Sequence, residues 1–231
     1  MRVYRIYLLL IFMVFFTTGC TSNQDLPDEE TTVFSEIETT ETAIDREQRI
    51  IFSCYATDGL SAYTLTKLIY EQPALNENAN LEYTVFSDLK RFNHVISETE
   101  QAMVILPFEE ALQILQSYKH FSLVGIVQVD EVELSLVVLI TEDILENHPE
   151  VAKAFIETFS KACEWNSQQR ERALAYAEQL NISKGINEKF PEKIVYSSAY
   201  DGISVIEETL QSELYENMDI NRILESVSRY F

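Results

Sequence analysis

Beyond residue 48 the chain alternates between short apolar runs and longer segments in which apolar positions recur at helical spacing. The apolar runs predict strands over Arg49–Tyr55, Leu81–Phe86, Gln101–Leu106, Phe121–Val129 and Leu134–Thr141, with a further strand or extended segment over Glu192–Ser197. The helical spacing predicts helices over Gly59–Glu71, Asp88–Glu98 and Phe108–Ser117, one that begins at Pro149, and others over Ser167–Leu180, Ile203–Leu214 and Ile220–Tyr230. This order predicts an α/β fold in which a mainly parallel sheet with flanking helices is followed by C-terminal helices.

Local signals support several of these boundaries. The first helix is expected to end near Gln72-Pro73, because the residue before a proline is disfavoured in helical conformation. Either Ser87 or Asp88 is suited to cap the second helix. The strands over 121–129 and 134–141 are apolar at nearly every position, which is typical of strands covered on both faces.

The first twenty residues have the pattern of an export signal. Arg2 and Arg5 precede a short apolar stretch, which ends at Thr17-Thr18-Gly19-Cys20 and is shorter than a membrane-spanning helix needs. Small residues before a cysteine at this place resemble the lipobox of bacterial lipoproteins, although Thr17 stands where that pattern usually has leucine. The resemblance implies a signal peptide over 1–19 and a lipid on Cys20 that anchors the protein on the extracytoplasmic side of the cell membrane. The alternative is an uncleaved membrane anchor.

Residues 20–48 are predicted to form a flexible, acidic tether. The segment is rich in Asp, Glu, Thr and Ser and offers few residues to bury, a composition that favours disorder. Its few apolar residues, Val33, Phe34 and Ile37, are expected to make no contact with the rest of the chain. Residues 49–231 then suit a single domain.

The net charge and the cysteine residues limit the kinds of partner that the protein is expected to have. The formal net charge of −21 argues against nucleic acid, whose phosphates require Lys and Arg. It also gives no attraction to anionic lipid, so attachment depends on the acyl chains at Cys20. Cys54 and Cys163 lack metal-ligand spacing, and we expect both to be buried as small apolar side chains, with a disulfide between them as the alternative.

Four segments, taken in order, resemble a known family. They are Ala56–Leu68, Ala102–Ala111, Leu136–Phe155 and Ala162–Asn166, and the most specific are the phrases around Ile144–Phe155 and Lys161–Asn166. Together they resemble the solute-binding lipoproteins of ABC importers of the nitrate, sulphonate and thiamine-precursor class. Members of that family have two α/β lobes that close on a small molecule. Here only one periplasmic-binding-protein-like lobe is expected, because nothing between Val129 and Leu134 leaves room for a second.

Two turns are candidates for ligand binding. The first contains Asp58, Gly59, Ser61 and Ala62, directly after the first strand, and the resemblance implies that Gly59, Ser61 and Ala62 help to form a pocket. The structural alternative is that Asp58 caps a helix and Gly59 eases the turn. Because Asp58 would repel an anion, we expect a neutral or cationic, heterocyclic ligand. The second turn contains Pro107, Phe108 and Glu109, where Phe108 either stacks on a ring or is a buried residue at the start of a helix.

No set of residues indicates catalysis. The domain has no glycine-rich phosphate loop, and its histidines lie far apart, so we expect neither an enzyme nor a cofactor or metal. The leading hypothesis is a membrane-anchored solute-binding component of an ABC importer, with an ABC permease and a small molecule as partners. The alternative is a non-catalytic interaction or scaffold lipoprotein, built on a remnant lobe that has lost ligand capture.

Overall fold

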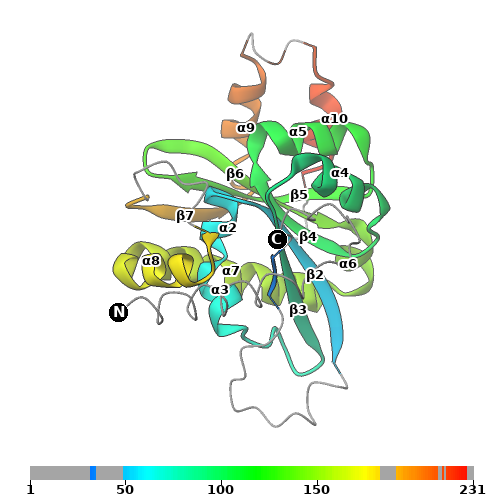
Figure 1. Cartoon of the computed structure of the whole chain (residues 1–231). Coiled ribbons are helices and arrows are strands. Elements are labelled where there is room, and N and C mark those ends of the chain that lie inside the picture. Colours follow the sequence, from blue (N-terminus) through cyan, green and yellow to red (C-terminus); the bar gives the residue numbers. More distant parts are fainter. Residues whose placement is uncertain (1–31, 35–48, 183–190, 213–214, 216, 228–231) are drawn as a thin grey trace, which may run out of the picture. The chain divides into compact units, whose positions relative to one another are not determined.

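The strands of the domain form one mixed sheet in the computed structural model, which describes residues 32–34, 49–182, 191–212, 215 and 217–227 (Figure 1). The strands are β1 Thr32–Phe34, β2 Ile50–Thr57, β3 Ala79–Phe86, β4 Ala102–Pro107, β5 Phe121–Val129, β6 Val132–Thr141 and β7 Ile194–Ser198. Their order across the sheet is β1-β3-β2-β4-β6-β5-β7. The α/β fold is therefore confirmed.

Parallel pairing is limited to the middle of the sheet. Strand β2 pairs parallel with β3 and with β4, whereas the pairs β1–β3, β4–β6, β5–β6 and β5–β7 are antiparallel. The prediction of a mainly parallel sheet holds for this central part only. The cause is the two-residue connection Asp130–Glu131, which joins β5 and β6 as a hairpin and inserts β6, in the opposite direction, between β4 and β5.

Helices cover both faces of the sheet. One face carries α2 Leu60–Thr64, α3 Thr66–Glu71, α6 Glu142–Asn147, α7 Pro149–Gln168 and α8 Arg170–Gln179. The other carries α4 Leu89–Glu98, α5 Phe108–Ser117 and the C-terminal helices α9 Ile203–Leu210 and α10 Ile220–Glu225. The expected flanking and C-terminal helices are thus confirmed.

Side chains of the central strands alternate between two apolar cores. In β4, Met103 and Ile105 point into the core beneath α7, and Val104 and Leu106 into the core beneath α5. All four are completely buried. The continuous apolar character of these strands therefore reflects coverage on both faces, as predicted, and burial of this much apolar surface supplies the main stabilisation of the fold.

Three local features differ from the predictions. The helix expected over Gly59–Glu71 is broken at Leu65 into α2 and α3, and α6 precedes the helix that begins at Pro149. Within the tether, which was expected to make no contact, Thr32–Phe34 forms β1 and pairs with β3. The physical reason is that β3 would otherwise end the sheet with unpaired backbone groups, which another extended segment can satisfy.

Other predictions stand or lie outside the described residues. Cys54 and Cys163 are completely buried free thiols, and burial raises the pKa of both. Residues 1–31, which include Cys20 and the signal segment, and residues 35–48 of the tether lie outside the described part of the chain. Among the described residues, no helix combines the length and the apolar character that crossing a membrane requires.

Candidate functional site at the carboxyl edge of the sheet

The two predicted turns lie next to each other at one edge of the sheet. Asp58 follows the last residue of β2, and Pro107 is the last residue of β4. These strands are parallel neighbours in which Ala56 pairs with Ile105, so both turns leave the same edge on adjacent strands. Carboxyl ends of such strands are where open α/β sheets bind ligands.

The first turn is built around Gly59. This residue has a φ of 93°, a conformation that favours glycine, and it occupies the N-cap position of α2. Asp58 is therefore not the N-cap that the structural alternative assumed. Its carboxylate instead accepts a hydrogen bond from the N–H of Gly59 at 2.7 Å, and its own N–H donates to the carbonyl oxygen of Phe86 at 2.8 Å. Asp58 thus ties the turn to the end of β3.

Ser61 and Ala62 face the interior. Both are buried, and the hydroxyl of Thr57 donates a hydrogen bond to the Ser61 oxygen at 3.2 Å. Gly59 is buried as well, so among the four predicted residues of this turn only Asp58 is half-exposed. Gly59, Ser61 and Ala62 therefore lie in the interior beneath the carboxyl edge of the sheet and not on its accessible surface.

In the second turn, Phe108 is covered by the C-terminal part of the chain. Its side chain is 2% exposed, and its ring packs edge-to-face against Tyr215 at a centroid distance of 6.1 Å. This arrangement agrees with the second alternative given for Phe108, a buried residue at the start of a helix. Pro107 beside it is half-buried.

Of the two carboxylates beside Phe108, Glu109 belonged to the predicted second turn and Glu110 was not predicted. Glu109 and Glu110 occupy the first turn of α5, where negative charge is favourable at a helix N-terminus. One carboxylate oxygen of Glu110 is buried and has no hydrogen-bond partner among the described residues. Burial, and secondly the charge of Glu109, raise the pKa of Glu110. The sequence motif Pro-Phe-Glu-Glu could have indicated these carboxylates, because acidic residues that directly follow a strand and a proline lie at the carboxyl edge of the sheet.

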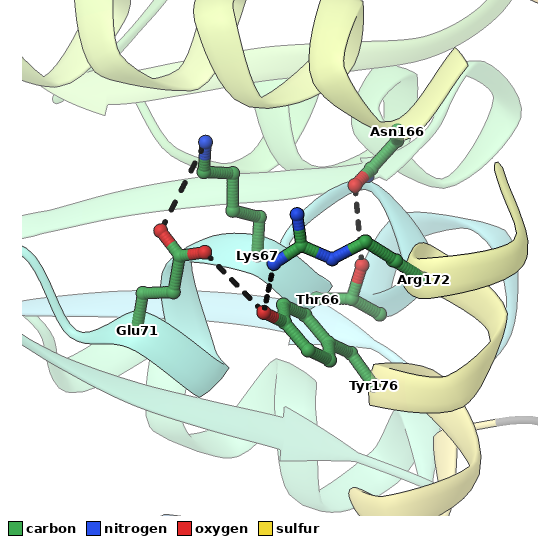
Figure 2. A network of polar contacts seen from close by, with 6 residues as sticks. All are labelled: Thr66, Lys67, Glu71, Asn166, Arg172 and Tyr176. Atoms are coloured by element: carbon green, nitrogen blue, oxygen red, sulfur yellow. Dashed lines mark hydrogen bonds and ion pairs between the residues drawn. The ribbon is translucent and has the colours of Figure 1, made fainter. Parts of the chain in front are cut away.

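The segment Ala162–Asn166, which was prominent in the family resemblance, lies on another part of the molecule and has a structural role. Asn166 of α7 is buried, and its amide donates to the carbonyl oxygens of Tyr63 at 3.0 Å and Thr64 at 3.2 Å. The Thr66 hydroxyl lies 3.4 Å from the amide oxygen of Asn166 (Figure 2). Asn166 thus satisfies backbone groups at the break between α2 and α3.

Trp165, the neighbour of Asn166, joins three helices on the surface. Its ring stacks on Tyr176 of α8 at 5.4 Å, while Lys67 of α3 and Arg172 of α8 lie over it at 4.9 and 5.3 Å. Arg172 also donates to the Tyr176 hydroxyl at 3.2 Å (Figure 2). Both cations already use the aromatic faces, so this cluster stabilises the packing of α3, α7 and α8.

Comparison with known proteins gives one structural likeness. No family model matches the chain, and no curated protein matches it by sequence. The fold is similar to that of an ABC transporter from Parabacteroides distasonis, known from a crystal structure, with a TM-score of 0.58 and 11% sequence identity. The likeness covers 75% of this chain and 94% of that one. At this identity the likeness establishes the shared α/β fold alone.

Proposed function

We propose that this chain is a lipid-anchored, extracytoplasmic solute-binding component of an ABC importer. The observation that carries the proposal is the likeness to the ABC transporter from Parabacteroides distasonis, which extends over 94% of that chain. A solved chain of similar extent therefore shares this fold. The export signal and Cys20 support the anchored location, and the four family-like segments support the importer class.

The ligand proposed for the carboxyl edge is a small neutral or cationic molecule, with a heterocycle as the leading class. Asp58 and Glu109 are accessible there, and Glu110 carries a buried carboxylate oxygen without a partner among the described residues. These carboxylates would repel nitrate or a sulphonate and would attract a cation or a hydrogen-bond donor.

A second candidate function is an interaction lobe that contacts a permease or another protein without capturing a solute. The burial of Gly59, Ser61, Ala62 and Phe108 favours it, because these four predicted ligand contacts are enclosed by the protein itself. The tight β5–β6 hairpin also favours it, since the chain does not leave this lobe to build a second one there.

Ligand-dependent thermal unfolding of the full-length protein separates the two functions. The panel contains thiamine precursors, other heterocycles, sulphonates and nitrate. A compound that binds only the folded state stabilises it by RT ln(1 + [L]/Kd), about 2.7 kcal/mol at a hundredfold excess over Kd. We expect a saturable rise in Tm with one neutral or cationic class, which Asp58→Asn reduces and Glu146→Gln, on the exposed surface of α6, does not.

Each other outcome has a clear meaning. A saturable shift with a sulphonate or nitrate would contradict the proposed ligand class while keeping solute binding. A folded protein that shifts with no compound, but that can be cross-linked in membranes to a permease subunit, would replace the solute-binding proposal with the interaction lobe.

A further inference from the structure

A polar cleft lies at the opposite edge of the sheet from Asp58 and Pro107. Phe121, the first residue of β5, and Glu142, which follows β6, are at its base, and α10 forms one wall. The end of α5, with Tyr118 and Lys119, forms another wall. The volume of the cleft is about 750 Å³, which lies within the range of small-molecule sites.

The cleft exists because the C-terminal segment is fixed beside β5. The N–H of Leu123 donates to the carbonyl oxygen of Ser226 at 2.8 Å, and Leu123 and Val227 form a parallel bridge. Ile223 of α10 is buried in the core beneath α5, so the helix is held by packing as well as by the backbone. Figure 1 shows α10 beside α5 at this part of the domain. The walls of the cleft are therefore fixed by the fold.

Two cations line the cleft, and neither is in an ion pair with a described residue. Within the described part of the chain, neither Lys119 nor Arg222 has a carboxylate within 4.0 Å, although Asp219 and Glu225 lie three residues from Arg222 on either side. This is unexpected in a chain with 38 acidic and 17 basic residues. For the exposed Lys119 a missing partner costs little. Arg222 is half-buried, and a partly desolvated guanidinium needs acceptors for its N–H groups.

The carboxylates of the cleft divide into one that is used and two that are available. Asp219 caps α10 by accepting a hydrogen bond from the N–H of Arg222 at 3.1 Å. The side chains of Glu142 and Glu225 line the cleft, are exposed, and accept no hydrogen bond from the described residues. Two cations thus face the same space as two available carboxylates, and the half-buried Tyr118 adds an aromatic surface.

We infer that this cleft binds a small zwitterion of the α-amino acid type. The ligand carboxylate is received by the planar fork of Arg222 together with Lys119, and the ammonium group is received by Glu142 and Glu225. An apolar side chain of the ligand lies against Tyr118. A ligand with a single charge would leave one pair of protein charges without a partner, so it is expected to bind more weakly. The site is separate from the carboxyl edge and does not depend on the function proposed for that edge.

The test compares zwitterions with their singly charged counterparts on the mature full-length protein in detergent. The probes are L-alanine, L-leucine and L-phenylalanine, each beside the amine that lacks the carboxylate and the acid that lacks the ammonium group. Binding is measured by titration calorimetry. We expect saturable binding of at least one amino acid, with its amine and acid at least about tenfold weaker, because each loses one charge-assisted contact.

Variants locate the binding site. Arg222→Gln and Glu225→Gln are each expected to weaken binding of the amino acid by about tenfold or more. Arg222→Lys keeps the charge but not the planar fork, so it is expected to weaken binding by less. Arg91→Gln, on the exposed surface of α4, and Asp58→Asn are expected to leave it unchanged. Circular dichroism of each variant confirms that it is folded.

Two results would overturn the inference. One is that the folded wild-type protein binds none of the three amino acids. The other is binding that survives both Arg222→Gln and Glu225→Gln. If Asp58→Asn alone weakens binding of the amino acid, the amino acid binds at the carboxyl edge and not in the cleft. The protein would then still bind a solute, but the cleft would not be its site. Failure of the heterocycle panel alone would affect only the function proposed for the carboxyl edge.

Discussion

Asn166 is the residue on which the junction between α2 and α3 depends. Its amide serves two buried carbonyl groups at once, those of Tyr63 and Thr64. Replacement by aspartate keeps the shape and the oxygen that faces Thr66 but removes both donated hydrogen bonds. Because unsatisfied buried groups cost about 1–3 kcal/mol each, we expect Asn166→Asp to lower the free energy of unfolding by about 2–4 kcal/mol, measured by urea denaturation.

The control for this prediction is Asn93→Asp on α4. Asn93 is exposed, so its replacement is expected to change the free energy of unfolding by less than about 0.5 kcal/mol. Equal effects of the two changes would show that Asn166 does not hold the junction.

Gly125 is fixed by the ring that covers it. A Cβ atom at this position of β5 would lie 2.2 Å from Cε2 of Tyr196 on the neighbouring strand β7. The Tyr196 ring cannot move away easily, because it packs edge-to-face on Phe159 and its hydroxyl donates to the carbonyl oxygen of Val124 at 3.3 Å. We expect Gly125→Ala to destabilise the protein by about 1–3 kcal/mol in thermal or urea unfolding.

A double-mutant cycle tests this cause. In a protein that already carries Tyr196→Leu, the smaller side chain leaves space, and Gly125→Ala should cost at least about 1 kcal/mol less than in the wild type. Additive effects would mean that the ring is not what excludes a larger residue.

At the level of elements, Asp130 joins the β5–β6 hairpin to the start of β7. Its carboxylate accepts hydrogen bonds from the N–H groups of Glu192 at 2.7 Å and Lys193 at 2.9 Å, and its own N–H donates to the carbonyl oxygen of Lys193 at 2.8 Å. Its φ of 52° lies in the left-handed region, which Asn and Asp tolerate better than most residues. Asp130→Ala should therefore loosen β7, which ends the sheet on this side of the described structure.

Hydrogen exchange measures this effect directly. We expect Asp130→Ala to speed exchange of the amides of Ile194–Ser198 several-fold while those of β2 stay protected, because local opening of an edge strand does not require global unfolding. Asp130→Asn keeps an acceptor and the backbone preference, so it should recover part of the protection. Identical exchange in Asp130→Ala and Asp130→Asn would count against the role of the carboxylate.

Strand β1 closes the other end of the sheet by backbone pairing. Val33 stands opposite Thr84 in an antiparallel register. Proline at this position removes a backbone N–H and is poorly accommodated in a paired strand. Val33→Pro is expected to speed amide exchange in β3, Ala79–Phe86, whereas Thr42→Pro, outside β1, is expected to have no effect there. Unchanged exchange in β3 after Val33→Pro would mean that β1 contributes nothing to its protection.

Periodicity predicted those elements that depend on local sequence. The helix Phe108–Ser117 was predicted residue for residue, and Asp88 caps α4 through its bond to the N–H of Lys90 at 2.8 Å. The break at Leu65 could not be predicted, because the side chain that stabilises it belongs to Asn166, which lies 103 residues after Tyr63 in the sequence. The antiparallel direction of β6 could have been inferred, since a two-residue connection cannot join parallel strands.

The candidate site was predictable only in position. The rule for carboxyl ends of strands brought Asp58 and Pro107 together at one edge, as the β2–β4 register places them. The exposure of the site residues was not predictable, because Phe108 is covered by Tyr215, a contact between distant segments that no local pattern encodes. The opposite cleft also escaped prediction, since Lys119 and Arg222 are isolated cations in the sequence and only the docking of α10 beside α5 brings them together.

For the whole molecule, the proposed attachment to the membrane depends on one residue, Cys20. Removal of residues 1–19 would take away Arg2 and Arg5 and no acidic residue, so the mature chain would be more acidic than the formal charge of −21. Such a chain is repelled by anionic lipid, which leaves the acyl chains as the force that holds it. Because two or more acyl chains give stable binding, we expect the wild-type protein to remain with membranes at high salt and to incorporate labelled palmitate.

Cys20→Ala is expected to abolish the palmitate label and to leave the signal segment on the chain, which intact-mass measurement detects, because cleavage before a lipid-modified cysteine requires that cysteine. The alternative of an uncleaved anchor makes the opposite prediction for the wild type, whose intact mass would then include residues 1–19 and no lipid. The unfolding midpoint of the domain serves as the control and should be unchanged, since Cys20 precedes the first described strand, which begins at Thr32. A wild-type mass with residues 1–19 still attached and no acyl chains would remove the lipid anchor from the proposed function, and the fold and both candidate ligand sites would be unaffected.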